Sequence, residues 1–127
     1  MTSVIDPSFI DLWKEYLRAV NEHSYPDVKA CLSPNVEIWK GGKLLIKDNW
    51  EQLEKNYRDH WALPNAVVTI DSIEECGDGV VTKLIDHANK VLINVKYIYG
   101  LEDGKWLHIR HEIGEIVAWN DEGTTEN

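Results

Sequence analysis

Residues 104–119 read GKWLHIRHEIGEIVAW, and their side chains alternate between two sets along most of this stretch. Alternation with a period of two is typical of a strand that has one buried face and one exposed face. The set that contains Leu107, Ile109 and Ile113 is the more apolar of the two, so it predicts the inward face. This assignment places one titratable ring, His111, in the middle of a buried apolar stripe.

The opposite assignment of the two faces stays open. With the first assignment, His108, Arg110 and Glu112 form an outer stripe beside Trp106, and their charges suit cross-strand pairs on an open sheet face. If the faces are reversed, the same three polar side chains point inward. The site would then contain a charged triad in place of a single histidine.

The rest of the chain is predicted to contain three helices and five strands. A start signal at residues 6–8 precedes apolar residues that recur at helical spacing as far as Val20. A short second helix is expected over residues 26–32. Asp48, which has Glu51 three residues later in a capping pattern, is expected to begin a third. Strands are predicted at residues 36–39, 44–46, 66–75, 80–88 and 91–101.

The order of these elements predicts an α+β fold. Turns of two to four residues separate the last four strands, so these strands should pair as consecutive antiparallel hairpins. The helices must bury their apolar stripes against the sheet. We therefore expect a cone: a curved antiparallel sheet wrapped around a long N-terminal helix, with two further helices. Residues 1–119 are expected to form a single domain, and residues 120–127 a disordered polar tail.

The acidic composition of the chain argues against some classes of binding partner. The 127 residues include 22 acidic and 13 basic side chains, which give a formal net charge of −9. This charge argues against binding to nucleic acid or to anionic membranes, both of which require basic surfaces. The start of the chain lacks the pattern of a signal peptide, and no apolar stretch approaches the ~20 residues that span a bilayer. Cys31 and Cys76 have no CxxC spacing, so we expect reduced thiols in a cytoplasmic protein.

Four segments give the chain a resemblance to the nuclear-transport-factor-2-like superfamily, and to its SnoaL-like polyketide cyclase and isomerase branch in particular. These segments are PDVKACLSPNVEIWKGG (26–42), NWEQLEKNYRDHW (49–61), the turn GDGVV (77–81) and DGKWLHIRHE (103–112). The resemblance covers roughly residues 7–119. It implies a cone whose interior binds apolar small molecules, with a polar acid or base on the last strand. Many relatives carry an Asp there, and the nearest matching position in this chain is His111.

Two side chains are the main candidates for proton transfer. His111 could act as a general acid or base, because the ordinary pKa of imidazole lies near the working pH of most enzymes. The alternative is a structural histidine whose ring is satisfied by a backbone carbonyl. Asp86 shares the inward parity of its strand and could orient His111 or act as the base itself. Its place close to a hairpin is also typical of a turn residue.

Aromatic and polar side chains could complete the site. Tyr16 could donate its hydroxyl proton to an enolate oxygen, as in an oxyanion hole. The residues predicted to bind substrate are Trp13, Trp39, His60, Trp61 and Tyr97. The alternative for the aromatic residues is that they simply fill the core. A histidine in the last turn of a helix is also common because its positive form interacts favourably with the helix dipole.

The sequence leaves two functions to weigh. The first is a cofactor-free isomerase, cyclase or dehydratase that transfers protons on an apolar polyketide- or terpenoid-like substrate. The second is a non-catalytic ligand-binding or dimeric interaction module of the same fold. The motifs of metalloproteases, dinucleotide-binding domains and P-loop proteins do not occur, so no metal or cofactor is expected. By analogy with the superfamily, we expect a homodimer formed through the open sheet face.

Overall fold

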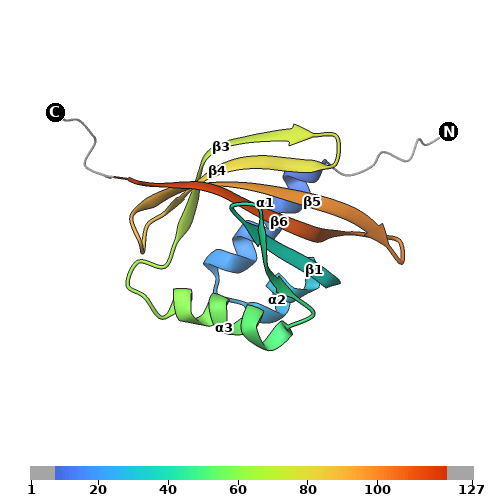
Figure 1. The fold of residues 1–127 in the computed structure, drawn as a ribbon, viewed down its shortest axis with the longest axis horizontal. Coiled ribbons are helices and arrows are strands. Elements are labelled where there is room, and N and C mark those ends of the chain that lie inside the picture. The colour runs from blue at the N-terminus through green and yellow to red at the C-terminus, as the bar shows by residue number, and fades with distance from the viewer. Residues whose placement is uncertain (1–7, 120–127) are drawn as a thin grey trace.

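The computed structural model describes residues 8–119, which form three helices and six strands (Figure 1). The helices are α1 (Phe9–Asn21), α2 (Tyr25–Ala30) and α3 (Trp50–Trp61). The strands are β1 (Leu32–Lys40), β2 (Lys43–Lys47), β3 (Val68–Cys76), β4 (Gly79–Asp86), β5 (Val91–Glu102) and β6 (Lys105–Ala118). The predicted disordered tail at 120–127 lies outside the described residues. No helix within residues 8–119 has the length and apolarity needed to cross a bilayer.

Helix α1 forms because its sequence provides both a cap and one continuous apolar face. The hydroxyl oxygen of Ser8 accepts hydrogen bonds from the backbone N–H groups of Ile10 (3.1 Å) and Asp11 (3.4 Å), which otherwise have no partner in the first turn. Trp13 is fully buried and Tyr16 nearly so. The helix therefore presents these two rings to the sheet.

The start of α3 differs by one residue from the prediction. Asn49, and not Asp48, is the N-cap, and its side-chain oxygen accepts from the backbone N–H of Gln52 at 3.1 Å. Asp48 has a φ of 54°, so it serves the turn before the helix. Asn and Asp are almost equally good caps, which is why two adjacent candidates could not be separated by pattern alone.

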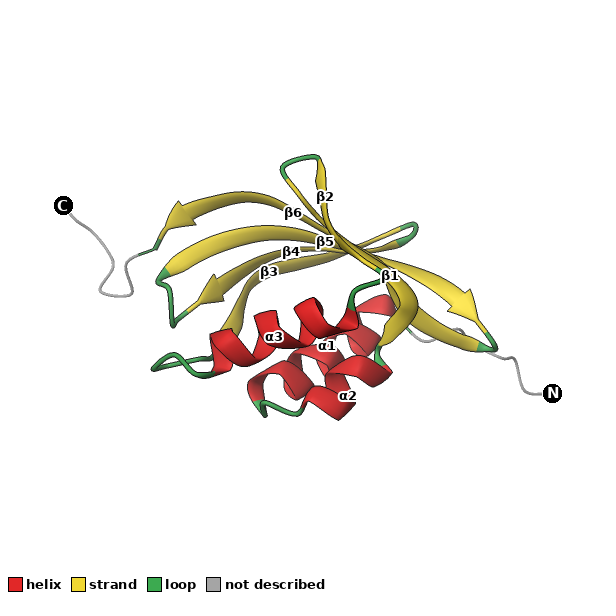
Figure 2. Cartoon of the chain, turned by 60° about the horizontal axis from the view of Figure 1, so that its bottom comes forward, coloured by secondary structure: helices red, strands yellow, loops and turns green. Residues whose placement is uncertain are grey.

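All three helices lie against one face of a single curved sheet (Figure 2). The strand order is β2-β1-β6-β5-β4-β3, and β3 to β6 pair as the consecutive antiparallel hairpins that the short turns predict. Strands β1 and β6 pair in parallel, so the sheet is mixed. A parallel pair needs a long connection, and α3 with the three strands β3 to β5 provides it. The α+β cone is therefore the observed architecture.

Strand β6 contains two bulges. Its register with β5 pairs Ile98 with Arg110 and Tyr99 with His108, so Ile109 is an extra residue without a partner. A second irregularity follows closer to the C-terminus, where three steps along β6 match two steps along β5. A bulge bends its strand and increases the local twist. The two bulges thus help to curve the sheet over the helices.

The first bulge also changes which residues of β6 point toward the helices. His111 points to the helix side and lines the cavity described below. His108, three residues earlier, is buried on the same side with an exposed fraction of 1%. Ile109 packs on the opposite face, where a Cβ atom added to Gly100 would lie 2.8 Å from its side chain, and Leu107 is paired with that same glycine. The expectation that Leu107 and Ile109 face inward was therefore wrong.

Candidate functional site

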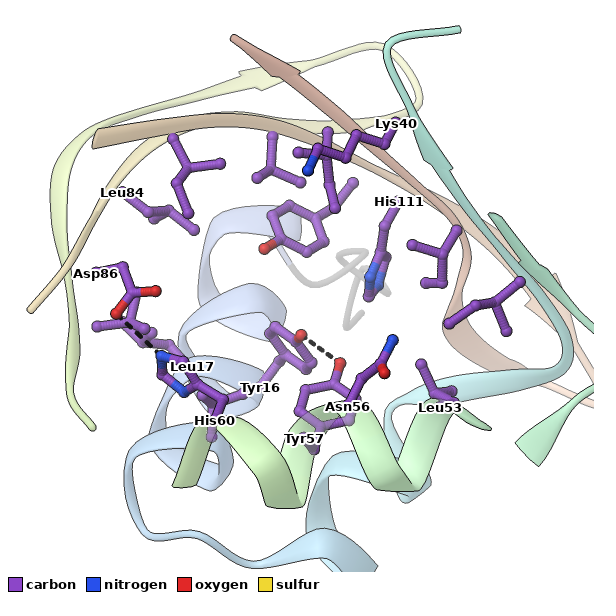
Figure 3. A pocket seen from close by; sticks show the side chains of 18 of the residues that line it. Tyr16, Leu17, Lys40, Leu53, Asn56, Tyr57, His60, Leu84, Asp86 and His111 are labelled. Carbon is purple, nitrogen blue, oxygen red and sulfur yellow. Dashed lines mark hydrogen bonds and ion pairs between the residues drawn. The ribbon is translucent and has the colours of Figure 1, made fainter. Parts of the chain in front are cut away.

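A cavity of about 310 Å³ lies between α1, α3 and the face of the sheet that carries the helices (Figure 3). This volume is at the lower end of the range of about 300–1,000 Å³ that is usual for small-molecule sites. Most of its wall is aliphatic. The polar or aromatic lining residues are Trp13, Tyr16, Lys40, Asn56, Tyr57, His60, Asp86, Tyr97 and His111. An apolar cavity with a few polar groups is the usual form of a ligand site.

Two imidazole rings form a buried pair at one wall of the cavity. Nδ1 of His108 lies 2.8 Å from Nε2 of His111, so one of these nitrogens donates a proton and the other accepts it. Nε2 of His108 lies 2.9 Å from the hydroxyl oxygen of Tyr99. Burial lowers the pKa of both histidines, and the nearby ring of His111 lowers that of His108 further. Both rings are therefore neutral at physiological pH.

Tyrosine rings surround the histidine pair. The Tyr97 ring is edge-on to His111 at a centroid distance of 4.6 Å, and Tyr16 packs against His108 at 4.6 Å. Among residues 8–119, no carboxylate hydrogen-bonds to either imidazole. The pair is therefore held by rings and by neutral hydrogen bonds, and any positive charge that it gained would have no ion-pair partner close by.

Two hydroxyl groups meet below His111 in the same cavity. The hydroxyl oxygens of Tyr16 and Tyr57 are 2.6 Å apart, one on α1 and the other on α3 (Figure 3). Burial raises the pKa of both phenols, so both stay protonated. The bond between them uses one of the two hydroxyl protons. The second proton can be donated to an oxygen atom of a ligand.

An imidazole and a carboxylate form a second pair on the other side of the cavity (Figure 3). Nε2 of His60 lies 2.9 Å from Oδ1 of Asp86. Asp86 also accepts hydrogen bonds from the Asn89 side chain (2.9 Å) and from the backbone N–H of Ala88 (3.0 Å). Burial opposes the charge of Asp86, but the hydrogen bonds from His60 and Asn89 outweigh it and lower its pKa to about 2. Asp86 is thus a charged turn residue that also contacts the cavity.

The structure brings together most of the predicted site residues, though not in the expected pairs. Tyr16, Asp86, His111, Trp13, His60 and Tyr97 all line the cavity. Asp86 bonds to His60 and not to His111, whose partner is His108. The idea that Asp86 orients His111 was wrong, because the two residues lie on opposite sides of the cavity (Figure 3).

Trp39 does not line the cavity. Its neighbours Ile38 and Lys40 do, and alternate residues of a strand point to opposite faces. On the outer face, the Trp39 indole donates a hydrogen bond to Glu37 at 2.8 Å, and the guanidinium of Arg110 lies over its ring at 4.6 Å. This arrangement is a cation–π contact at the sheet surface, so the prediction of a cavity wall was wrong.

Trp61 also lies away from the cavity wall. Its ring is stacked on His23 at 5.3 Å and tilted against Tyr57 at 5.8 Å. Trp61 therefore packs α3 onto the end of α1. It could influence the cavity only through Tyr57.

Sequence reasoning missed the role of several residues. His108 was assigned to the outer face under the preferred assignment, and the bulge at Ile109 moved it inward. Tyr57 lies at helical spacing from Leu53 and Trp61, which explains its position on α3, but nothing in the sequence pairs its hydroxyl with Tyr16. The spacing His-Ile-Arg-His, three residues apart in a strand, would place both rings on one face only if a bulge lay between them.

The sequence matches no protein-family model and no curated protein. Solved structures do match. An NTF2-like protein of unknown function from Shewanella oneidensis MR-1 is 14% identical with a TM-score of 0.63, over 84% of this chain and 95% of that one. AclR from Streptomyces galilaeus, provisionally described as a hydroxylase, is 16% identical with a TM-score of 0.61, over 86% and 78%.

A de novo designed protein with a curved β-sheet is also similar, at 20% identity and a TM-score of 0.62, over 84% of this chain and 83% of the design. Natural proteins and a designed protein thus share this architecture, so the fold alone does not identify an activity. At these identities the matches report architecture and not chemistry. The helices, the curved mixed sheet and these likenesses together show that the chain has the fold of the nuclear-transport-factor-2-like superfamily.

Proposed function

We propose that the protein is a cofactor-free enzyme of the SnoaL-like type, which moves a proton on a small apolar substrate that contains a carbonyl group. The supporting observation is the pairing, in one apolar cavity, of a neutral imidazole with two protonated phenols. A base and a hydrogen-bond donor for an oxyanion are the two parts that enolisation requires. Isomerisation, cyclisation and dehydration all begin with such a step.

His111 is the proposed base. Nε2 of His111 is occupied by His108, so Nδ1 is the nitrogen that remains for a substrate. Burial keeps the ring neutral, which is the form that accepts a proton. The surrounding apolar wall excludes water, which otherwise would compete with the substrate for Nδ1 and protonate the enolate.

Tyr16 and Tyr57 are the proposed oxyanion donors. When the substrate loses a proton beside its carbonyl group, negative charge develops on the carbonyl oxygen. The hydroxyl proton that is not used between Tyr16 and Tyr57 can bind that oxygen. Such a donor, fixed in position in a dry site, typically contributes ~10²–10³ in rate.

His60 and Asp86 are proposed to hold the other end of the substrate. The carboxylate of Asp86 accepts from Nε2 of His60, so it fixes the orientation of the ring. A hydroxyl or carbonyl group on the substrate could bond to this pair, while Trp13 and Tyr97 contact its apolar body. The size of the cavity favours a compact polyketide- or terpenoid-like molecule over a large multi-ring one.

A non-catalytic binding module is the second candidate function. A binding module needs the cavity but has no use for a base, so it predicts that the cavity binds ligands equally well without His111. An interior filled by aromatic side chains would have favoured this candidate. The cavity is open instead, and its wall carries His60, Asp86 and His111.

Turnover of 5-nitrobenzisoxazole tests the proposal without knowledge of the natural substrate. A base removes the proton from the C–H group of the isoxazole ring, the N–O bond breaks, and the coloured product is 2-cyano-4-nitrophenolate. We expect the wild-type protein to catalyse this reaction, and His111→Gln to reduce kcat/KM by at least about 100-fold. His87→Gln is the matched control, because His87 bonds to Thr69 and does not line the cavity. Equal rates for the wild type and His111→Gln would contradict the proposal.

We also propose a cytoplasmic homodimer in which two copies meet through the sheet face that carries no helix. That face holds Trp39, Arg110 and Glu112 in one cluster, with the Arg110–Glu112 ion pair at 3.0 Å. Leu44, which pairs with Trp39, is exposed at 45%, and Val81, which alternates with the buried Val80 and Thr82 of β4, is exposed at 44%. A mixture of exposed apolar and charged side chains is usual at interfaces between subunits.

A further inference from the structure

A chain of hydrogen bonds leads away from the cavity through the core between the sheet and α1. It begins at His111, passes to Nδ1 of His108 over 2.8 Å, and continues from Nε2 of His108 to the hydroxyl of Tyr99 over 2.9 Å. His108 is 1% exposed, and Tyr99 is 6% exposed and stacked on Phe9 at 5.0 Å. The proposed reaction uses His111 as the base and gives no role to His108 or Tyr99.

The two nitrogens of His108 have different neighbours, and this fixes the direction of the chain. If His111 takes up a proton at Nδ1, its Nε2 carries a proton as well and must donate. Nδ1 of His108 is then the acceptor, and Nε2 of His108 carries the proton and donates to the oxygen of Tyr99. Each of the two hydrogen bonds then has one donor and one acceptor.

We propose that His108 is a positioning residue that shares the proton taken up by His111, with Tyr99 as the acceptor that holds His108 in the required tautomer. This inference rests on the proposed function. In the forward step the substrate C–H bond breaks, its electron pair stays on the substrate as an enolate, and the proton bonds to Nδ1 of His111. The proton on Nε2 of His111 shifts toward Nδ1 of His108. Both shifts reverse when His111 returns the proton to another atom of the substrate, so no proton leaves the site.

The physical reason for such sharing is the absence of a countercharge. An imidazolium in an apolar cavity loses its hydration, and here no described carboxylate bonds to either ring. The rings packed on the two imidazoles are the neutral phenols Tyr16, Tyr97 and Tyr99, and Lys40, which lines the same cavity, is basic and so offers no countercharge. A short N···N hydrogen bond spreads the charge over two rings, and hydrogen-bond chains strengthen one another at low dielectric. His108 thus makes His111 a stronger base in the substrate complex than a single buried imidazole.

The test combines kinetics with nitrogen NMR. We expect His108→Gln to lower kcat for 5-nitrobenzisoxazole by about 10- to 100-fold with KM nearly unchanged, since His108 does not touch the cavity. Tyr99→Phe, which keeps the stack on Phe9 and removes only the hydroxyl, should lower kcat by less. It serves as the second variant if His108→Gln does not fold. The His87→Gln control should keep the wild-type rate.

The NMR measurement separates sharing from packing. 6-Nitrobenzotriazole is an acidic azole that resembles the probe substrate but has no N–O bond to break, so it can give its N–H proton to His111 and stay bound. In protein with ¹⁵N-labelled histidine, its binding should shift the ring nitrogens of both His108 and His111. A shift confined to His111, or full activity in His108→Gln and Tyr99→Phe, would overturn the inference. If His111→Gln also kept full activity, the proposed function itself would fail.

Discussion

The two buried imidazoles should make the stability of the protein sensitive to acid. Burial lowers the pKa of His108 and His111 in the folded state, whereas in the unfolded chain both titrate near ~6.5. Below that pH the unfolded chain binds protons that the folded protein does not. The free energy of unfolding therefore falls as the pH drops below about 6.5, by up to about 1.4 kcal/mol per pH unit for each histidine.

Urea denaturation between pH 7.5 and pH 5 measures this effect. We expect the slope to be steep for the wild type and for His87→Gln. The double variant His108→Phe/His111→Phe should lose most of the slope, whatever its stability at pH 7.5. A stability that stays constant in the wild type over this range would mean that the two rings are not buried as neutral groups.

At the level of single residues, the sequence predicted which side chains would surround a cavity better than it predicted their partners. Tyr16, Asp86 and His111 were chosen from strand and helix periodicity, and all three line one cavity. The pairs His60–Asp86 and Tyr16–Tyr57 depend on how α3 sits over the sheet. The position of α3 over the sheet cannot be predicted from a short segment of sequence, because it depends on contacts between separate elements.

At the level of elements, regular periodicity was informative and its interruptions were not. The apolar stripe predicted α1, and alternation predicted β6 as a strand. The bulge at Ile109 is one additional residue in β6, and a strand pattern cannot distinguish an additional residue from a regular one. This single residue moved His108 to the buried face and Leu107 to the outer face. The bulge is therefore the reason why the His108–His111 pair could not be predicted from the sequence.

The pairing of β4 with β5 gives a sharp prediction at this scale. A Cβ atom added to Gly79 would lie 1.8 Å from the backbone oxygen of Tyr97, which cannot move without breaking the strand pair. Gly79→Ala should therefore lower the free energy of unfolding by at least about 2 kcal/mol. Gly114→Ala is the matched control, because its nearest atoms belong to Asn94 at 3.6 Å.

Thermal or urea denaturation of the two alanine variants would check this prediction. Because β5 also carries Tyr97 and Tyr99, a displaced β4–β5 pair should disturb the cavity as well, and Gly79→Ala should lose turnover of 5-nitrobenzisoxazole. Equal stability of Gly79→Ala and Gly114→Ala would show that β4 and β5 do not approach as closely as described.

At the level of the whole molecule, the layered α+β cone was predictable and one strand pairing was not. The short turns that connect β3, β4, β5 and β6 predict that strands consecutive in the chain pair with one another, and they do. The parallel pairing of β1 with β6 joins strands at opposite ends of the chain. It follows from how the open, curved sheet covers α1, which is a property of the complete fold and of no local segment.

The proposed dimer is also a prediction for the whole molecule. Light scattering after gel filtration should give a mass of twice 14.6 kDa for the wild type. Arg110→Glu would replace the cation that pairs with Glu37 (3.2 Å) and Glu112 by a third carboxylate, so it should shift the protein toward the monomer. Lys14→Glu reverses an exposed charge on α1, on the helix side of the sheet, and is the control. A wild-type mass of a single chain would contradict the proposed dimer.

The central claim is that a neutral, desolvated His111 removes a proton within the cavity, and the pH dependence of kcat/KM for 5-nitrobenzisoxazole tests it most directly. Because burial lowers the pKa of His111 to well below the ordinary value near ~6.5, the base stays unprotonated through weakly acidic solution. We predict a kcat/KM that is constant from about pH 8 down to about pH 5. A decline centred near pH 6.5, as for an imidazole in water, would contradict the claim.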